Sequence, residues 1–165
     1  MPHGALASCV FSAILTVACL APAPAAERAT DAARELNVAA RFGRMDVAIS
    51  RTSSSARENF IRRRGEWGRE IRVVDVELAG MSMPDSERAI VEVDYSWMRM
   101  SEGTLHTTRV AQHWRDSEGS WRLERELRTA GDLGLFGEAV EIVKPPRRDV
   151  QFATKVIPGT STAAD

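Results

Sequence analysis

The chain has 165 residues, and its 22 Lys and Arg against 23 Asp and Glu give a formal net charge of −1. Such a balance argues against a protein built to neutralise phosphates, so we expect no nucleic-acid partner. Cys9 and Cys19 are the only cysteines. Because both lie near the N-terminus, the sequence beyond them carries no disulfide, thiolate metal site or cysteine nucleophile.

Residues 1–26 have the composition of an export signal. The first Lys, Arg, Asp or Glu of the chain is Glu27. The apolar stretch from about Ala5 to Leu20 is shorter and less hydrophobic than the roughly 20 apolar residues of a membrane span. We therefore predict an exported protein of the periplasm or the outer cell envelope.

Two processing sites compete within this segment. Leu15 to Cys19 (Leu-Thr-Val-Ala-Cys) resembles a bacterial lipobox, which implies lipidation of Cys19 and an anchor to the membrane. Ala23 to Ala26 offers a small-x-small cleavage site that would release a soluble product beginning near Ala26 or Glu27. The sequence slightly favours the lipoprotein and leaves both alternatives open.

Helical periodicity follows the export signal. Apolar spacing predicts a helix from Thr30 to Phe42, with Thr30 or Asp31 as the N-cap. A short helical turn is expected over 45–49, and a further helix over 55–67. The last helix buries Phe60 and places a group of arginines on its opposite, solvated face: Arg57, Arg62, Arg63 and Arg64.

Beyond Gly68 the pattern changes to the alternation of strands. A first strand over 71–78 contains the adjacent apolar pair Val73 and Val74, which predicts a β-bulge. The clearest strand starts at Ala89, with alternate residues apolar as far as Trp97. Its acids, Glu92 and Asp94, fall on the opposite face and should point to solvent.

Two tight turns continue the chain into an antiparallel meander. The residues Ser101 to Gly103 and Asp116 to Gly119 predict hairpin turns on either side of a strand over 104–115. In the fourth strand, alternation places Trp121, Leu123, Arg125 and Leu127 on one face. The expected domain covers 27–128, and 129–165 is expected to be an irregular extension with an edge strand near 150–157.

Helices followed by strands predict the α+β class, with N-terminal helices packed on a curved antiparallel sheet that forms a half-cone around a cavity. The order of elements and three segments resemble the nuclear-transport-factor-two-like superfamily, also called cystatin-like or ketosteroid-isomerase-like. Those segments are 41–46 (Arg-Phe-Gly-Arg-Met-Asp), 112–115 (Gln-His-Trp-Arg) and 119–122 (Gly-Ser-Trp-Arg). The resemblance implies a pocket in the cone and does not select among the superfamily's isomerases, dehydratases, hydrolases, adaptors and inert domains.

A proton-transfer enzyme on such a fold needs an Asp, Glu or His inside the cone. Strand parity makes His106 the only histidine that could line the cavity, although a structural role is the commoner one for such a residue. Asp46 is a second catalytic candidate, with an N-cap for a turn starting at Val47 as the alternative. Tyr95 is the third, as a hydrogen-bond donor.

Binding residues are expected on the same inward face. Tyr95, Trp97 and Gln112 are the predicted pocket-lining residues. No metal or other cofactor is expected, because His106 and His113 fall on opposite strand faces and no acidic cluster has calcium-loop spacing.

The sequence therefore favours a non-catalytic envelope domain that binds an envelope protein partner or a small apolar ligand. Met81, Met83, Met98 and Met100 would supply an adaptable contact rim. The alternative is an isomerase- or dehydratase-like enzyme that uses His106 or Asp46 together with Tyr95. The oligomeric state stays open.

Overall fold

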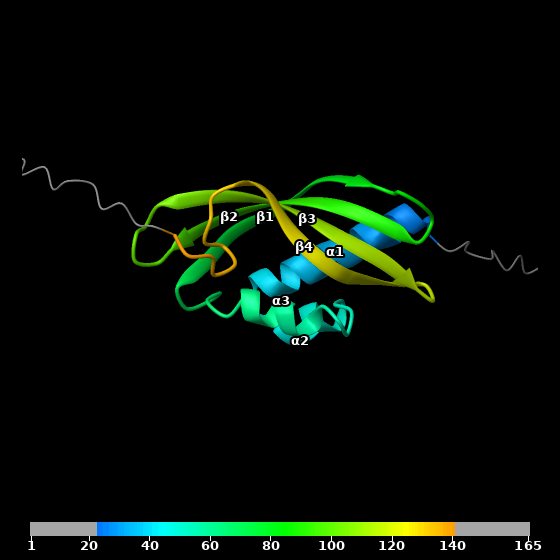
Figure 1. Cartoon of the computed structure of the whole chain (residues 1–165), viewed down its shortest axis with the longest axis horizontal. Helices are drawn as coiled ribbons and strands as arrows, with labels where there is room; N and C mark the ends of the chain where they lie inside the picture. The colour runs from blue at the N-terminus through cyan, green and yellow to red at the C-terminus, as the bar shows by residue number, and fades with distance from the viewer. Residues whose placement is uncertain (1–22, 141–165) are drawn as a thin grey trace, which may run out of the picture.

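The computed structural model describes residues 23–140 (Figure 1). Cys19 and the predicted edge strand at 150–157 lie outside the described residues. Three helices precede four strands: α1 (Ala25–Arg41), α2 (Met45–Ser50), α3 (Arg57–Arg63), β1 (Ile71–Ser82), β2 (Arg88–Arg99), β3 (Leu105–Ser117) and β4 (Ser120–Gly131). The strands form one antiparallel sheet in the order β1-β2-β3-β4, an arrangement compatible with the α+β class.

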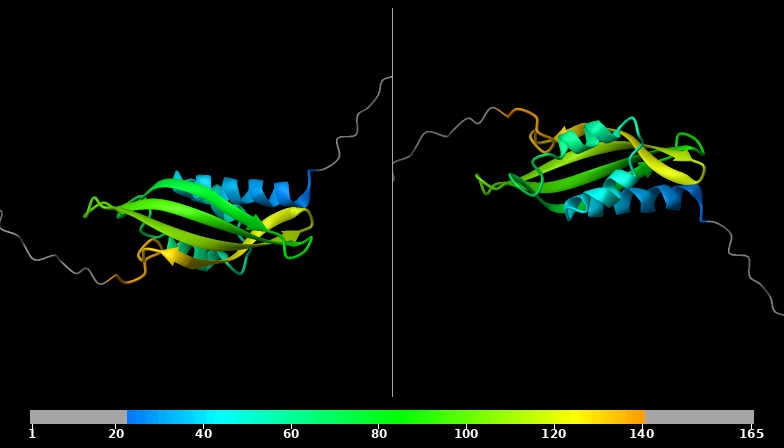
Figure 2. Two further views of the ribbon diagram at one scale, coloured as in Figure 1. Left: turned by 90° about the horizontal axis from the view of Figure 1, so that it is seen from above. Right: turned by 90° about the horizontal axis from the view of Figure 1, so that it is seen from below.

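The helices lie on one face of this sheet, and the opposite face is open (Figure 2). α1 meets the sheet through a stripe of small residues, which lets its backbone approach the strands closely. The buried positions of α1 are Ala29, Ala32, Ala33, Leu36, Asn37, Ala39 and Ala40. Within residues 23–140, no helix combines the length and the apolar character needed to cross a bilayer.

α1 begins five residues earlier than the sequence pattern predicted. The N-cap is Pro24, not Thr30 or Asp31. Thr30 lies inside the helix, where its hydroxyl donates a hydrogen bond to the Ala26 carbonyl at 2.9 Å. A threonine that bonds back by four residues continues a helix, so its capping tendency is not used here.

α3 is shorter than expected, whereas the predicted turn of helix at 45–49 is confirmed as α2. α3 ends at Arg63, and the chain then turns through Gly65 and Gly68 into β1. Gly68 has a φ of 79°, a left-handed conformation that ends helical geometry and favours glycine. Trp67 consequently leaves the helix and forms an isolated bridge with Ile71.

The bulge predicted in β1 is confirmed. Val73 pairs with Trp97 and Asp75 pairs with Ser96, so Val74 is the extra residue. A second irregularity follows Leu78. The bulge exposes Val74 and aims its carbonyl at Arg41 of α1, which donates a short hydrogen bond to it.

A bulge in β4 overturns the predicted parity of that strand. Trp114 pairs with Leu123 and His113 pairs with Arg125, which leaves Glu124 as the extra residue. Beyond it, alternate residues change faces. Leu127, expected in the core, is 48% exposed, and Glu126 is buried in its place.

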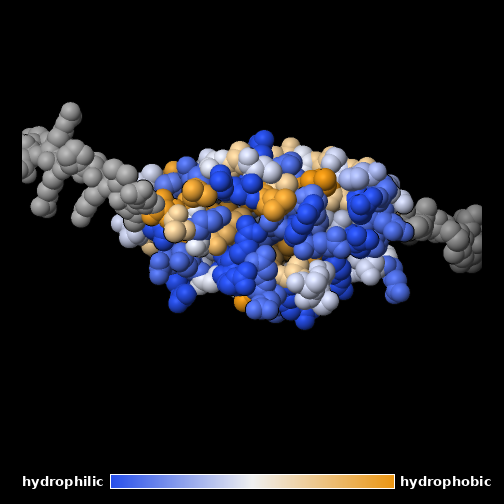
Figure 3. Space-filling view, viewed as in Figure 1, coloured by the Kyte–Doolittle hydropathy of each residue, from blue (hydrophilic) through white to orange (hydrophobic). Residues whose placement is uncertain are grey.

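The space between helices and sheet is filled, so the expected half-cone around a cavity is wrong. The alternation predicted for β2 is confirmed, since every second side chain from Ala89 to Trp97 is at most 1% exposed. Trp97, Trp114 and Trp121 are fully buried and occupy the interior together with Tyr95. Aromatic side chains of this size leave no open cone behind the sheet. Polar residues cover most of the outer surface in Figure 3.

The core also includes residues beyond the expected boundary at 128. After β4 the chain folds back over the end of the sheet, and Leu135 and Phe136 become buried. The indole nitrogen of Trp67 donates a hydrogen bond of 2.8 Å to the Leu135 carbonyl. The Glu138 carboxylate accepts backbone hydrogen bonds from Gly134 and Phe136 at 3.1 and 2.9 Å. These contacts make the segment after β4 part of the packed domain.

Candidate functional site

A chain of buried polar side chains crosses the interior between the helices and the sheet. Its members come from four different elements and from the turn after α3. They are Asn37 of α1, Arg64, Tyr95 of β2, Gln112 of β3 and Glu126 of β4. Each is at most 6% exposed, so each must find its partners within the protein.

Arg64 and Glu126 form a bidentate ion pair at one end of this chain. The two terminal guanidinium nitrogens of Arg64 donate to the two carboxylate oxygens of Glu126 at 2.7 and 2.6 Å. Burial opposes the charge on Glu126, but the attraction of Arg64 outweighs it, and the pKa of Glu126 lies below its ordinary value. The pKa of Arg64 is raised, because the same attraction outweighs its burial.

Two amides connect the ion pair to α1. Gln112 donates to Glu126 at 2.9 Å and exchanges two hydrogen bonds of 2.9 Å with Asn37. The Tyr95 hydroxyl donates a short hydrogen bond to the Asn37 side-chain oxygen. Burial raises the pKa of Tyr95, so its phenol stays protonated at neutral pH.

Aromatic rings enclose the Arg64 guanidinium. Its central carbon lies 3.7 Å from the ring centre of Phe60, 4.8 Å from that of Trp67 and 5.2 Å from that of Phe136. The central guanidinium carbon of Arg63 lies 4.0 Å from the ring centre of Phe136, and Arg63 donates a hydrogen bond of 2.7 Å to the Glu126 backbone carbonyl. The ion pair is therefore shielded from water on several sides.

The geometry makes this network structural. Both oxygens of Glu126 accept hydrogen bonds, and its lowered pKa keeps it a carboxylate at neutral pH, where it is neither a proton donor nor an effective base. The amides of Asn37 and Gln112 satisfy each other. A buried network in which the Glu126 carboxylate and both amides are paired fixes how the helices sit on the sheet.

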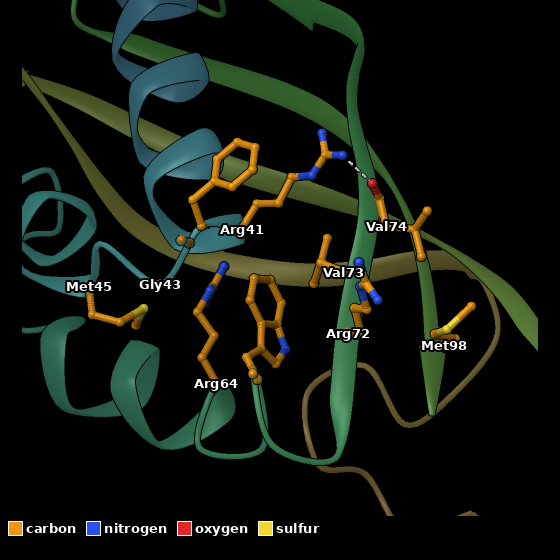
Figure 4. Close-up of a pocket in the computed structure, with 12 residues that line it drawn as sticks. Arg41, Gly43, Met45, Arg64, Arg72, Val73, Val74 and Met98 are labelled. Atoms are coloured by element: carbon orange, nitrogen blue, oxygen red, sulfur yellow. Dashed lines mark hydrogen bonds between the residues drawn. The ribbon is translucent and has the colours of Figure 1, made fainter. Parts of the chain in front are cut away.

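An open pocket of about 400 Å³ lies beside the network, where the end of α1 faces β1 (Figure 4). Its walls come from the turn between α1 and α2, the turn after α3, and the strands β1 and β2. The lining residues are Ala40, Arg41, Phe42, Gly43, Met45, Arg64, Trp67, Gly68, Arg72, Val73, Val74 and Met98. The volume lies within the usual range of sites for small ligands.

Three arginines contribute to the pocket wall, and they differ in how they are paired. Arg64 is held by Glu126. Arg41 donates to Asp75 at 2.8 Å, on the exposed surface. Arg72 is exposed and forms no ion pair with any side chain that the structure describes. The pocket thus has one arginine whose charge is not compensated locally.

The catalytic candidates of the sequence do not converge. His106 stacks on Trp97, with ring centres 4.6 Å apart, and its Nδ1 lies 3.3 Å from the Asp132 carboxylate near the edge of the sheet. Tyr95 bonds to Asn37 in the core instead. The pairing expected between His106 and Tyr95 is therefore absent from the described part of the chain.

Asp46 does not have the N-cap role expected as its alternative to catalysis. It is exposed, and it is the second residue of α2, whose N-cap is Arg44 and not Asp46. The acid remains in the first helical turn, where a negative charge favours the helix dipole.

The three predicted binding residues are core residues. Tyr95, Trp97 and Gln112 are each at most 1% exposed, and none of them lines the pocket at the end of α1. They point inward as predicted, but the interior they face is filled. The expected pocket in the cone is replaced by the open one beside β1.

The sequence missed Arg64 and Glu126, and it missed the pocket. The run Arg62 to Arg64 was interpreted as a solvated face, which holds for exposed Arg62 but not for buried Arg64. The nearby aromatics were the available signal, since arginine is the cation most often buried among rings. Within residues 23–140, no three His, Cys, Asp or Glu side chains are grouped as metal ligands would be.

No protein-family model matches the chain, and no curated protein matches it. Among solved structures, the chain is similar to the solution structure of a SEC-C motif containing protein from Rhodopseudomonas palustris. The two are 18% identical, with a TM-score of 0.49, over 58% of this chain and 74% of that chain. A likeness of this strength carries no functional argument. Membership of the nuclear-transport-factor-two-like superfamily stays a prediction.

Proposed function

We propose that the chain is an exported, non-catalytic binding domain that holds a small ligand in the pocket between the end of α1 and β1. The observation that carries this proposal is a difference between two neighbouring sites: one is a paired, buried network and the other is an open pocket. The buried ionisable groups Arg64 and Glu126 satisfy each other, whereas the pocket beside them is open and has an unpaired arginine, Arg72. The first site supports the fold, and the second has room for a ligand.

The enzyme alternative has less support. The sequence predicts no acidic side chain between the helices and the sheet, and the buried Glu126 contradicts that prediction. However, Glu126 is clamped by Arg64 and does not line the pocket. Glu92 and Asp94 lie on the open face, where Asp94 pairs with Arg109 at 2.6 Å. The described residues thus offer no acid or base within the pocket to move a proton.

The start of α1 bears on the proposed export route. Arg28 donates its backbone N–H to the Pro24 carbonyl at 3.1 Å and its guanidinium to the Ala23 carbonyl at 2.8 Å. Cleavage near Ala26 would remove both acceptors, whereas processing at Cys19 would keep them. These contacts support the lipid-anchored form. Mass spectrometry of the mature N-terminus tests it: diacylglyceryl on Cys19 is expected, and a free end near Ala26 would contradict it.

The binding function can be tested without knowing the ligand. A library of small fragments is titrated into ¹⁵N-labelled protein, and amide chemical shifts are followed by NMR. Shifts should gather around the pocket, at Phe42, Gly43, Gly68 and Val73. Hits gathered around His106 instead, or chemical turnover of a fragment, would overturn the proposal.

A further inference from the structure

The lining of the pocket carries positive charge and no negative charge among the described residues. Arg41, Arg64 and Arg72 contribute to its lining, and no acidic residue does so among the residues that the structure describes. Arg64 is neutralised by Glu126, and Arg41 is shared with Asp75 outside the pocket. Arg72 is exposed and has no ion-pair partner among the described side chains. The net field at the mouth therefore favours an anion.

Unused hydrogen-bond donors point the same way. Arg72 has no hydrogen-bond acceptor among the described side chains, and a guanidinium offers five N–H groups in a fork that fits carboxylate or phosphate. The Nε of Arg64 is buried and has no partner within residues 23–140. The Arg64 side chain is fully enclosed, however, so Arg72 and Arg41 are the arginines that can reach a ligand.

The rest of the lining is apolar. Trp67, Met45 and Val73 contribute to it, and in Figure 4 Arg64 lies between Met45 and Val73. Phe42 is 67% exposed at the rim, although it is a large aromatic side chain. An apolar ligand body would cover these groups and remove them from water.

We infer that the ligand of this pocket is a small organic anion, with an apolar body against Trp67 and Met45 and a carboxylate or phosphate on Arg72. The inference rests on the proposed function and names its ligand class. Arg72 supplies charge and geometry, and Arg41 supports it from α1. The apolar walls select against inorganic anions, which have no body to bury.

Three eight-carbon probes that differ in their head group test the inference by isothermal titration calorimetry: octanoate, 1-octanol and octylammonium. Octanoate should bind at least about tenfold more tightly than the other two, because only its head group matches Arg72. Arg72→Gln should remove most of this preference. The matched control is Arg125→Gln, an exposed arginine on β4 away from the pocket, which should bind like the wild type.

A second variant guards against an indirect effect at Arg72. Val74 lines the pocket and is partly exposed, so Val74→Glu places an acid at the wall without opening the core. It should weaken octanoate binding and strengthen octylammonium binding. Octyl phosphate, added as a fourth probe, distinguishes a phosphate from a carboxylate head group, and tight binding of either anion supports the inference.

The outcomes separate the two proposals. Equal binding of octanol and octanoate overturns the anionic ligand and leaves the binding function standing. A preference for octanoate that survives both variants overturns the assignment of the head group to Arg72. If no octyl probe binds although fragments shift the pocket amides, the ligand class is wrong. If neither the probes nor the fragments bind at the pocket, the proposed function falls with it.

Discussion

Glu126 is a charged side chain that is only 6% exposed, and the free-energy cost of burying it depends on what surrounds it. A buried carboxylate without a partner is strongly unfavourable. Here Arg64 brings the opposite charge in bidentate geometry, and Gln112 occupies a further lone pair. The pair is tolerated because both oxygens of Glu126 accept hydrogen bonds from Arg64, which makes it sensitive to the loss of either member.

Glu126→Gln should lower the free energy of unfolding by about 3–5 kcal/mol, because it leaves the Arg64 charge buried without its partner. Urea denaturation followed by tryptophan fluorescence measures this change. The double variant Arg64→Met with Glu126→Leu should recover most of the loss, since it removes both charges.

The control for this prediction is the exposed pair on the open face of the sheet. Asp94→Asn breaks a bidentate contact with Arg109 of similar length, but solvent screens that pair. Its effect should be much smaller than that of Glu126→Gln. Equal effects of the two substitutions would mean that burial does not govern the strength of the Arg64 pair.

The same ion pair predicts how stability depends on pH. The unfolded pKa of a glutamate is about 4.3, and the folded pKa of Glu126 lies below its ordinary value. The stabilisation is therefore fully present above about pH 4.3 and is lost as the pH falls through the folded pKa. Unfolding free energies measured from pH 7 down to pH 3 should fall more steeply for the wild type than for Glu126→Gln. Parallel curves would contradict the assignment.

At the scale of elements, two bulges show what the sequence can and cannot predict. Val74 was predictable, because two adjacent apolar residues interrupt an alternating strand. Glu124 was not, because Trp121, Leu123 and Leu127 keep an alternating spacing across it, with Arg125 at the position between them. The pairing with β3 determines where the bulge of β4 falls, and the sequence of one strand does not show how it pairs with its neighbour. The error at β4 hid Glu126, and with it the buried network.

The change of face at Glu124 can be tested by a matched pair of leucines. Leu123→Ala removes a side chain that is 1% exposed and should cost about 2–5 kcal/mol of unfolding free energy. Leu127→Ala removes one that is 48% exposed and should change stability little. Chemical denaturation of both variants measures the difference. A large loss at Leu127 would restore the alternating interpretation.

Two glycines at the end of the fold form a second matched pair. Gly131 and Gly137 both have positive φ, 82° and 76°, so alanine at either costs about 1–2 kcal/mol from backbone strain. At Gly131 the added Cβ would also lie 2.9 Å from the Thr108 Cα, whereas at Gly137 nothing lies within 4 Å. Gly131→Ala should therefore lower the melting temperature more. A scanning calorimeter measures both, and equal losses would contradict the close approach to β3.

At the scale of the molecule, local patterns predicted the order of the elements but not how the helices and the sheet pack together. The helices, the meander and the inward face of β2 follow from periodicity within short windows. The filled interior and the pocket depend on contacts between distant segments, such as Trp67 with Leu135. Side-chain volume decides whether a cone stays open, and a pattern of apolar positions does not measure volume.

The contacts between distant segments also determine when, during synthesis, the interior can form. Arg64 reaches a partner 62 residues further along the chain, and Trp67 reaches one 68 residues further. During synthesis, Arg64 and Trp67 therefore emerge before their partners in β4 and in the segment after it. Contacts of such long range form late and slowly. The export proposed above needs a chain that stays unfolded until it has passed the translocation pore, and the late formation of these contacts is consistent with that need.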